Sequence, residues 1–209
     1  MKVVYIGILK NESKPAFELS AERNLKGFNY FTQNTVSQFM TFFAAQIAEK
    51  TEPGVRQDFV DEERAPDSVF HAYGRTEGVC GIIVTDKEYP SVVAQGLLSK
   101  VCDEFVAKYP RTAYTSLQPP AKFASESLLA FPELKDYIVK YQDPKQADNI
   151  MKIQQELDDT KQVLHKTIES VLERGEKIDN LVAKSDGLSA QSKMFYTQAK
   201  KQNSCCTVM

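Results

Sequence analysis

An uninterrupted heptad repeat over residues 150–199 constrains this chain more than any other feature. Positions taken alternately three and four residues apart form a continuous seam, and most of them carry apolar or small side chains. No proline follows residue 150, and Glu, Lys, Gln and Asp fill the outer positions. The pattern predicts one left-handed coiled-coil helix, about 75 Å long at roughly 1.5 Å per residue. The seam positions are Ile150, Ile153, Leu157, Thr160, Leu164, Thr167, Val171, Arg174, Ile178, Leu181, Ser185, Leu188, Ser192, Phe195 and Ala199.

One seam residue does not suit a coiled-coil core. Arg174 lies in the run Leu-Glu-Arg-Gly, and a guanidinium has five N–H donors and no acceptor, so its burial is costly unless partners supply oxygens. A second copy of the helix would bring a second cation. Polar side chains also occupy seam positions that are usually apolar, namely Thr160, Thr167, Ser185 and Ser192. The helix is therefore better suited to a bundle with different helices, where three facing glutamines can offer amide oxygens to one arginine.

A heptad run with a single central arginine resembles the R-SNARE motif, and the resemblance covers residues 150–202. It implies a helix that zippers with three Q-SNARE helices, with Arg174 in the ionic layer and the other seam residues in the bundle core. It also implies recognition by the SNARE disassembly and tethering machinery. The alternative is a generic dimerising coiled coil that tolerates Arg174 in its seam or lets it extend outward.

Length and composition exclude several other classes. The 209 residues suffice for one core domain plus an extension, and a formal charge of −2 does not indicate nucleic-acid binding. The 4 cysteines form no Cys-x-x-Cys pair and show no paired spacing to histidine, so we expect no disulfide framework and no metal site. No glycine-rich phosphate loop or dinucleotide fingerprint is present, and we expect no cofactor. No signal peptide is visible, and no window approaches the roughly 18 apolar residues of a membrane span.

The N-terminal two thirds of the chain carry strand and helix patterns in alternation. Residues 2–9 are apolar and β-branched, and a turn leads to a return strand at 16–19. Further strands are predicted at 69–73 and 79–85, the second of them central in the sheet. The polar stretch 56–67 allows one short edge strand.

Three helices are predicted around these strands. The first begins near Thr35, which fits a capping box with Gln38. The second covers residues 89–109 and ends at a proline. The third is centred on residues 134–141, after a loop that includes residues 112–120.

This order predicts an α+β fold, a mixed β-sheet with helices on both faces, and it resembles the profilin-like longin domain that heads some R-SNAREs. The resemblance implies a longin domain at 1–142 and a linker at 143–149. The R-SNARE coiled-coil motif would follow at 150–202, with a lipidated tail at 203–209. The long SNARE helix would be able to fold back on the longin domain.

The C-terminus carries a lipidation pattern. Residues 206–209 read Cys-Thr-Val-Met and fit the C-a-a-X box, with a final Met that favours farnesyl on Cys206. Cys205 directly precedes it and is a candidate for palmitoyl or another second lipid. One chain gives marginal, reversible membrane binding, whereas two give stable anchoring. The alternative is a chance terminal cysteine.

Together these features resemble the longin R-SNAREs that lack a transmembrane helix and are anchored by a double-cysteine prenylation motif. That resemblance implies membrane fusion in vesicle-mediated protein transport, with a prenyltransferase among the partners. It places the protein in the cytosol and on the cytoplasmic face of Golgi, endosomal, vacuolar and ER-derived vesicle membranes.

Two other function classes compete with a fusion protein. One is an interaction scaffold with a coiled-coil tail, which would not need Arg174 in its seam. The other is an acyltransferase acting through Cys80 or Cys102. Cys80 and His71 form one candidate catalytic pair, and the alternative is that both are ordinary packed residues. We expect no catalytic residue and no enzyme.

A closed state off the membrane is also predicted, because a free helix with an apolar seam would fray or aggregate in water. The SNARE segment would fold back over an autoinhibitory groove formed by Phe42, Phe39 and Phe43, and the groove would also shelter the prenyl chain. The segment would break at Gly175 and Gly187, since glycine weakens helices. Alternatively, a neighbouring loop covers Phe42, and the apolar residues beside the seam are only bundle flanks. Those flanking residues are Val163, Ile168, Leu172 and Val182.

Overall fold

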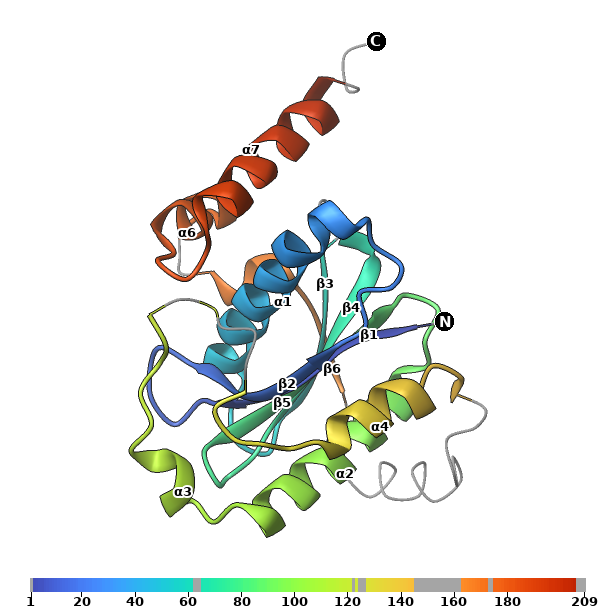
Figure 1. Cartoon of the computed structure of the whole chain (residues 1–209), viewed down its shortest axis with the longest axis vertical. Coiled ribbons are helices and arrows are strands. Elements are labelled where there is room, and N and C mark those ends of the chain that lie inside the picture. The colour runs from blue at the N-terminus through green and yellow to red at the C-terminus, as the bar shows by residue number, and fades with distance from the viewer. Residues whose placement is uncertain are drawn as a thin grey trace.

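A twisted sheet forms the centre of the structure (Figure 1). The structure, a computed structural model, describes residues 2–61, 65–121, 123, 127–144, 163–172 and 175–205, without the side chains of Pro66 and of residues 199–205. Within these residues the sheet has six strands in the order β2-β1-β5-β4-β3-β6. The pairs are antiparallel except for β3 with β6, which is parallel. The strands are β1 (Val3–Lys10), β2 (Phe17–Arg23), β3 (Arg56–Asp61), β4 (Ala65–Gly74), β5 (Val79–Asp86) and β6 (Leu164–Thr167).

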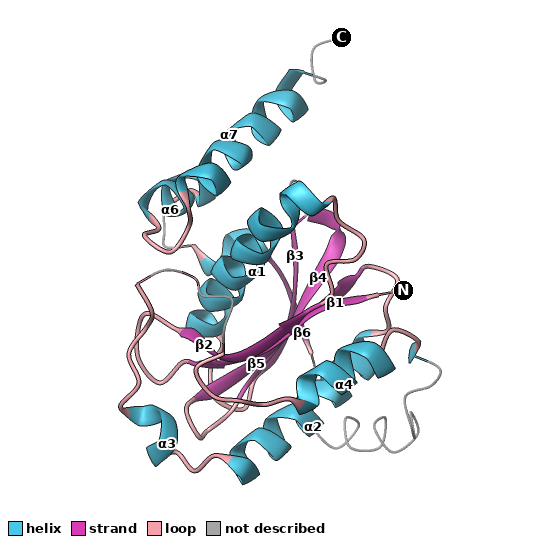
Figure 2. Cartoon of the chain, viewed as in Figure 1, coloured by secondary structure: helices cyan, strands magenta, loops and turns pink. Residues whose placement is uncertain are grey.

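Helices cover both faces of this sheet. Figure 2 shows α1 (Tyr30–Lys50) over one face and α2 (Ser91–Lys108) with α4 (Glu133–Lys140) over the other. The predicted α+β fold with a mixed sheet is therefore confirmed. The remaining described helices are α3 (Thr112–Thr115), the 3-10 helix η2 (Ile168–Val171), α6 (Ile178–Lys184) and α7 (Ala190–Cys205).

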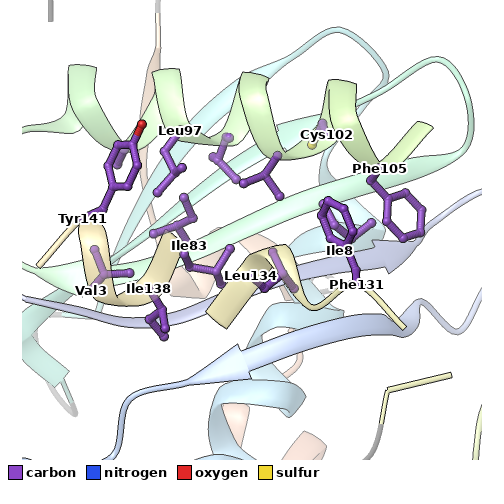
Figure 3. Close-up of a cluster of buried hydrophobic side chains, with 14 of the residues drawn as sticks. Val3, Ile8, Ile83, Leu97, Cys102, Phe105, Phe131, Leu134, Ile138 and Tyr141 are labelled. Atoms are coloured by element: carbon purple, nitrogen blue, oxygen red, sulfur yellow. The ribbon is translucent and has the colours of Figure 1, made fainter. Parts of the chain in front are cut away.

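β5 separates two apolar cores because successive side chains of a strand point to opposite faces. Ile83 lies in the core under α2 and α4, which Figure 3 shows, whereas Ile82 and Val84 lie in the core under α1. α2 approaches β5 closely at Gly81, where an added Cβ would lie 2.6 Å from the Cys102 sulfur. Both faces of the central strand are thus buried, as its continuous apolar sequence predicts.

The start of α1 differs from the prediction. The helix begins at Tyr30, and the Asn29 side chain caps it by accepting a hydrogen bond from the Phe31 N–H at 3.0 Å. Asparagine is among the best N-cap residues, and this cap adds more than a turn before Thr35. The proposed capping box of Thr35 and Gln38 was therefore wrong. Residues 112–115, predicted as loop, form the short helix α3.

The heptad region is not one helix in the described residues. Residues 163–172 and 175–205 form β6, η2, α6 and α7 in place of the predicted continuous coiled coil, which is wrong for this state. The chain turns at Gly175, whose φ is +84°, and α6 and α7 are separated around Gly187, as predicted for a closed state. Residues 145–162, which include the predicted boundary at 149, lie outside the described part. The domain boundaries at 142, 149 and 202 stay predictions.

Candidate functional site: the contact between the heptad segment and the N-terminal domain

β6 attaches the heptad segment to the sheet through its backbone. It pairs in parallel with β3, with Gln57 opposite Leu164 and Val60 opposite Thr167. Its side chains remain largely at the surface, and Leu164 is 43% exposed. β6 therefore satisfies the outer edge of β3, which would otherwise present unpaired N–H and C=O groups.

Apolar side chains then enter the core under α1. Ile168 and Val171 of η2 are 0% and 3% exposed, and Leu172 packs against them. After the turn at Gly175, α6 buries Ile178 and Val182 in the same core. Full burial of one such side chain is worth about 1.5–3 kcal/mol, so these residues supply the main attraction between the heptad segment and the domain.

α7 lies against the N-terminal half of α1 and runs antiparallel to it (Figure 1). Gln38 of α1 accepts hydrogen bonds through Oε1 from the Ser189 N–H at 2.9 Å and the Ser192 hydroxyl at 3.0 Å. The Tyr196 ring packs on Phe39 with 5.7 Å between ring centroids. Ser192, a poor residue for an apolar seam, is fully buried here with a polar partner.

The predicted groove residues lie at this contact, but they are less open than expected. Phe42 is 3% exposed and packs edge-on against Phe43 and Phe123, with centroid distances of 5.2 and 6.5 Å. Phe39 contacts Tyr196 of α7. The alternative that a neighbouring loop covers Phe42 therefore holds in part, because Phe123 belongs to the loop before α4.

A cavity of about 640 Å³ adjoins Phe42. Its lining includes Ala45 of α1, Pro15 of the β1–β2 turn and Phe123, and Leu181 and Gly187 of the heptad segment close another side. The cavity lies inside the range of about 300–1,000 Å³ typical of ligand pockets, and most of its named lining is apolar. Apolar residues make up most of the full lining, which also contains charged side chains of both signs, so the cavity suits a mainly apolar group.

The predicted seam and lipidation residues differ in where the structure places them. Val171, Ile178, Leu188 and Ser192 are buried against the N-terminal domain, and Leu181 and Ser185 are half-buried. Leu164, Thr167 and Phe195 are exposed. Ala199 and Cys205 lie in α7, where side chains are not described. The residues outside the described part are Ile150, Ile153, Leu157, Thr160, Arg174 and Cys206.

Two features of this contact were missed from the sequence. β6 was hidden because Val163–Thr167 also fits the heptad repeat, and pairing with β3 depends on an edge that only the folded sheet creates. The polar pair of Thr35 and Gln38 was assigned to a helix cap, although it faces α7 in the structure. The sequence signal that could have indicated this contact was the position of these two polar residues beside the apolar face of the helix.

The proposed cysteine–histidine pair has no catalytic geometry. His71 hydrogen-bonds Asp58 through Nδ1 at 2.8 Å and Thr85 through Nε2 at 2.9 Å, so both ring nitrogens are engaged elsewhere. Cys80 is fully buried, and burial raises the pKa of its thiol far above the ordinary value. Burial likewise raises the pKa of Cys102 to about 12. Neither thiol is accessible or ionised near neutral pH, as nucleophilic catalysis would require.

The described residues contain no cluster of His, Cys, Asp and Glu suited to a metal ion. Among the same residues, no helix combines the length and apolar character needed to cross a bilayer.

Comparison with known proteins gives two family matches and several full-length relatives. The Longin model, described as a regulated-SNARE-like domain, matches residues 25–138, and the Synaptobrevin model matches residues 149–207. The Synaptobrevin homolog ykt6 of Schizosaccharomyces pombe is 51% identical over 208 residues. The Synaptobrevin homologs YKT6 of Saccharomyces cerevisiae and Yarrowia lipolytica are 48% and 52% identical over 209 residues. In each case the alignment covers 100% of both chains.

Proposed function

Since this chain belongs to the longin-domain R-SNAREs of the synaptobrevin family and acts in vesicle fusion, we propose that the longin–SNARE contact is its inhibited state. The family is not enzymatic, and its R-SNARE helices act together with Q-SNARE helices. The proposal concerns how assembly is withheld until it is needed.

The observation that carries this proposal is the burial of seam residues. Val171, Ile178, Leu188 and Ser192 are each at most 5% exposed against the longin domain. Assembly into a four-helix bundle places the same side chains in the bundle core. One side chain cannot occupy both cores, so closure and zippering exclude one another.

The backbone reinforces this exclusion. Residues 164–167 form a strand in the closed chain, whereas the bundle needs them helical. A Q-SNARE helix therefore cannot nucleate on this segment until β6 leaves β3. Assembly must therefore overcome the free energy of the closed contact. Any ligand that binds only the open chain shifts the population toward the open state.

Within the bundle, we assign Arg174 to a polar layer facing three glutamines. The support is chemical: five donors on one guanidinium need several acceptors, and amide oxygens from three different helices supply them without adding charge. The other seam positions would form apolar layers on either side.

For the anchor, we assign farnesyl to Cys206 and palmitoyl or another second lipid to Cys205. Transfer of the first lipid requires a prenyltransferase, and two chains are needed for stable anchoring. We further infer action at Golgi, endosomal, vacuolar and ER-derived membranes, with tethering and disassembly machinery as partners. The cytosolic form of the chain would be closed.

The cavity beside Phe42 offers a shelter for the prenyl chain, with one structural condition. α7 begins near the cavity and continues as a helix to Cys205. At about 1.5 Å per residue its 16 residues carry the tail roughly 24 Å away. Prenyl burial in this cavity would therefore require the last turns of α7 to unwind and fold back.

Phe42→Glu tests the closed state. A buried charge beside Phe43 and Phe123 should release the SNARE segment, since an unpaired carboxylate in this core is strongly unfavourable. We expect faster hydrogen exchange over residues 163–198, tighter binding of Q-SNARE helices and a smaller cytosolic fraction. Val139→Glu is the matched control, because Val139 is 71% exposed on α4.

Protection of β1 and β5 reports separately on the longin fold, because both strands are interior in the sheet and neither pairs with the SNARE segment. Unchanged exchange over residues 163–198 together with an unchanged cytosolic fraction would contradict the proposal. Loss of protection in β1 and β5 would instead show unfolding, and Phe42→Leu would then be the milder variant to measure.

A further inference from the structure

Three aromatic side chains protrude from the corner between β2 and α1. Phe28, Tyr30 and Phe31 are 38%, 81% and 84% exposed. We call these three residues the aromatic corner. Large aromatic side chains are usually buried at least in part, so a cluster exposed to this extent on a folded domain indicates an interaction surface.

The backbone holds the aromatic corner in place. The Phe28 N–H donates to the Leu25 carbonyl at 3.0 Å, and Gln33 donates to the Leu25 and Phe28 carbonyls at 3.2 Å each. Asn29 caps the helix at Phe31. The rings of Tyr30 and Phe31 contact each other edge-on with centroids 5.8 Å apart. These bonds fix the backbone that carries the three rings, so the position of the aromatic corner at the surface belongs to the fold.

Two lysines lie beside the aromatic corner. Lys26 is the only charged residue between Asn24 and Ala48. Lys2 is exposed, and its ammonium lies beside Gly27, 3.8 Å from the position of an added Cβ. Exposed aromatic rings flanked by lysines match the polar–apolar boundary of an anionic bilayer, where aromatic residues concentrate and each nearby lysine gains attraction.

The direction of α7 is a second observation that favours a bilayer as the ligand. α7 runs antiparallel to α1, and its C-terminal end extends past the N-terminal end of α1, where the aromatic corner begins (Figure 1). The helix ends at Cys205. The C-terminal end of α7 and the aromatic corner therefore lie toward the same side of the described structure.

We propose that the aromatic corner docks into the headgroup region of an anionic bilayer when the chain is anchored by its C-terminal tail. The inference takes the proposed anchoring at Cys205 and Cys206 as its premise. Docking orients the longin domain with α7 still in contact with α1, so an anchored chain can rest on the membrane in its closed state. Release of α7 would then be a separate step from membrane arrival.

The chain contains no tryptophan, so Phe31→Trp introduces a single fluorescent reporter at the corner. The full chain carrying Cys205→Ser is coupled through Cys206 to a maleimide lipid in vesicles of phosphatidylcholine and phosphatidylserine. Coupling is selective because Cys80 and Cys102 are fully buried. It also replaces enzymatic lipidation, so failure of the lipid assignment cannot be mistaken for failure of this inference. Val139→Trp, on α4, is the control.

We expect the Phe31→Trp emission to shift to shorter wavelength on anchoring and to be quenched by brominated lipids, while Val139→Trp keeps its water-exposed emission. Vesicles without phosphatidylserine should give a smaller shift. A water-exposed emission from anchored Phe31→Trp would overturn the proposal. So would a shift that appears only after Q-SNARE helices are added, because the aromatic corner would then be a protein-binding surface.

Discussion

Truncation of Ile168 should open the closed state while leaving the bundle core intact. Ile168 is fully buried under α1 but lies beside the seam, next to Thr167. Ile→Ala changes at buried sites cost about 2–5 kcal/mol, including the cavity that is left. In the open chain this side chain is already exposed to water, so its truncation changes the free energy of the open state little. The ratio of closed to open molecules should therefore fall by roughly 30-fold to several thousand-fold.

Leu164→Ala is the matched variant with the opposite expectation. Leu164 occupies a seam position, yet it is 43% exposed in the closed chain, where β6 is held by its backbone. Its truncation should change closure by less than about 1 kcal/mol. In the bundle the same change removes a core side chain and should cost about 2–5 kcal/mol.

Two assays separate the variants. Hydrogen exchange of the β6 amides measures opening, and binding of soluble Q-SNARE helices measures assembly. Ile168→Ala should accelerate exchange until the chain is fully open and should tighten apparent Q-helix binding by the same factor. Leu164→Ala should leave exchange nearly unchanged and weaken binding. If both variants accelerate exchange equally, or if Ile168→Ala leaves it within about twofold, the exclusion argument is wrong.

Three further predictions address other parts of the chain. Arg174→Gln should weaken or misregister assembly with Q-SNARE helices, and one arginine on a partner helix should partly restore it; undiminished membrane fusion by the variant would refute the ionic layer. Cys206→Ser should be unprenylated and cytosolic, while Cys205→Ser should be prenylated but reversibly bound, and equal flotation of Cys205→Ser and the parent would refute a second lipid. Hydrogen bonds from Arg75 lower the pKa of Glu77 from its ordinary 4.5 to about 2. This pair therefore stabilises the fold fully above pH 4.5, and its contribution is lost as the pH falls toward 2. NMR titration should give that value, and thermal unfolding of Glu77→Gln should lose this part of the acid dependence; titration near 4.5 would refute the pairing.

The longin fold was largely predictable because its signals are local. The apolar run of β5 and the prolines around α2 mark their elements without reference to the rest of the chain. The start of α1 was missed because Asn29 was not recognised as a cap, and the later Thr35 and Gln38 offered a competing motif. Helix boundaries depend on one or two hydrogen bonds, so a single unrecognised cap displaces them by more than a turn.

The SNARE segment was harder to predict because its sequence is compatible with two structures. The heptad repeat describes the assembled helix, and the same residues form strand, 3-10 helix and helix when the longin domain replaces the partner helices. Gly175 and Gly187 were predictable breaks, since glycine weakens helices. Gly175 also has a positive φ, which glycine tolerates. β6 was not predictable, because the attraction of residues 164–167 to β3 exists only once the sheet has formed an open edge.

The most direct test of the central claim is a distance measured across α1 and α7 in the full chain. Spin labels at Asn34 and Gln191, both exposed, report this distance in Cys205→Ser/Cys206→Ser protein. Contacting helices lie about 8–10 Å apart at their axes, so the free chain should give a narrow distribution near roughly 20 Å once label lengths are included. Addition of Q-SNARE helices should replace it with a broad distribution at longer distances. A long distance in the free chain, or a short one that persists in the assembled bundle, would contradict the account.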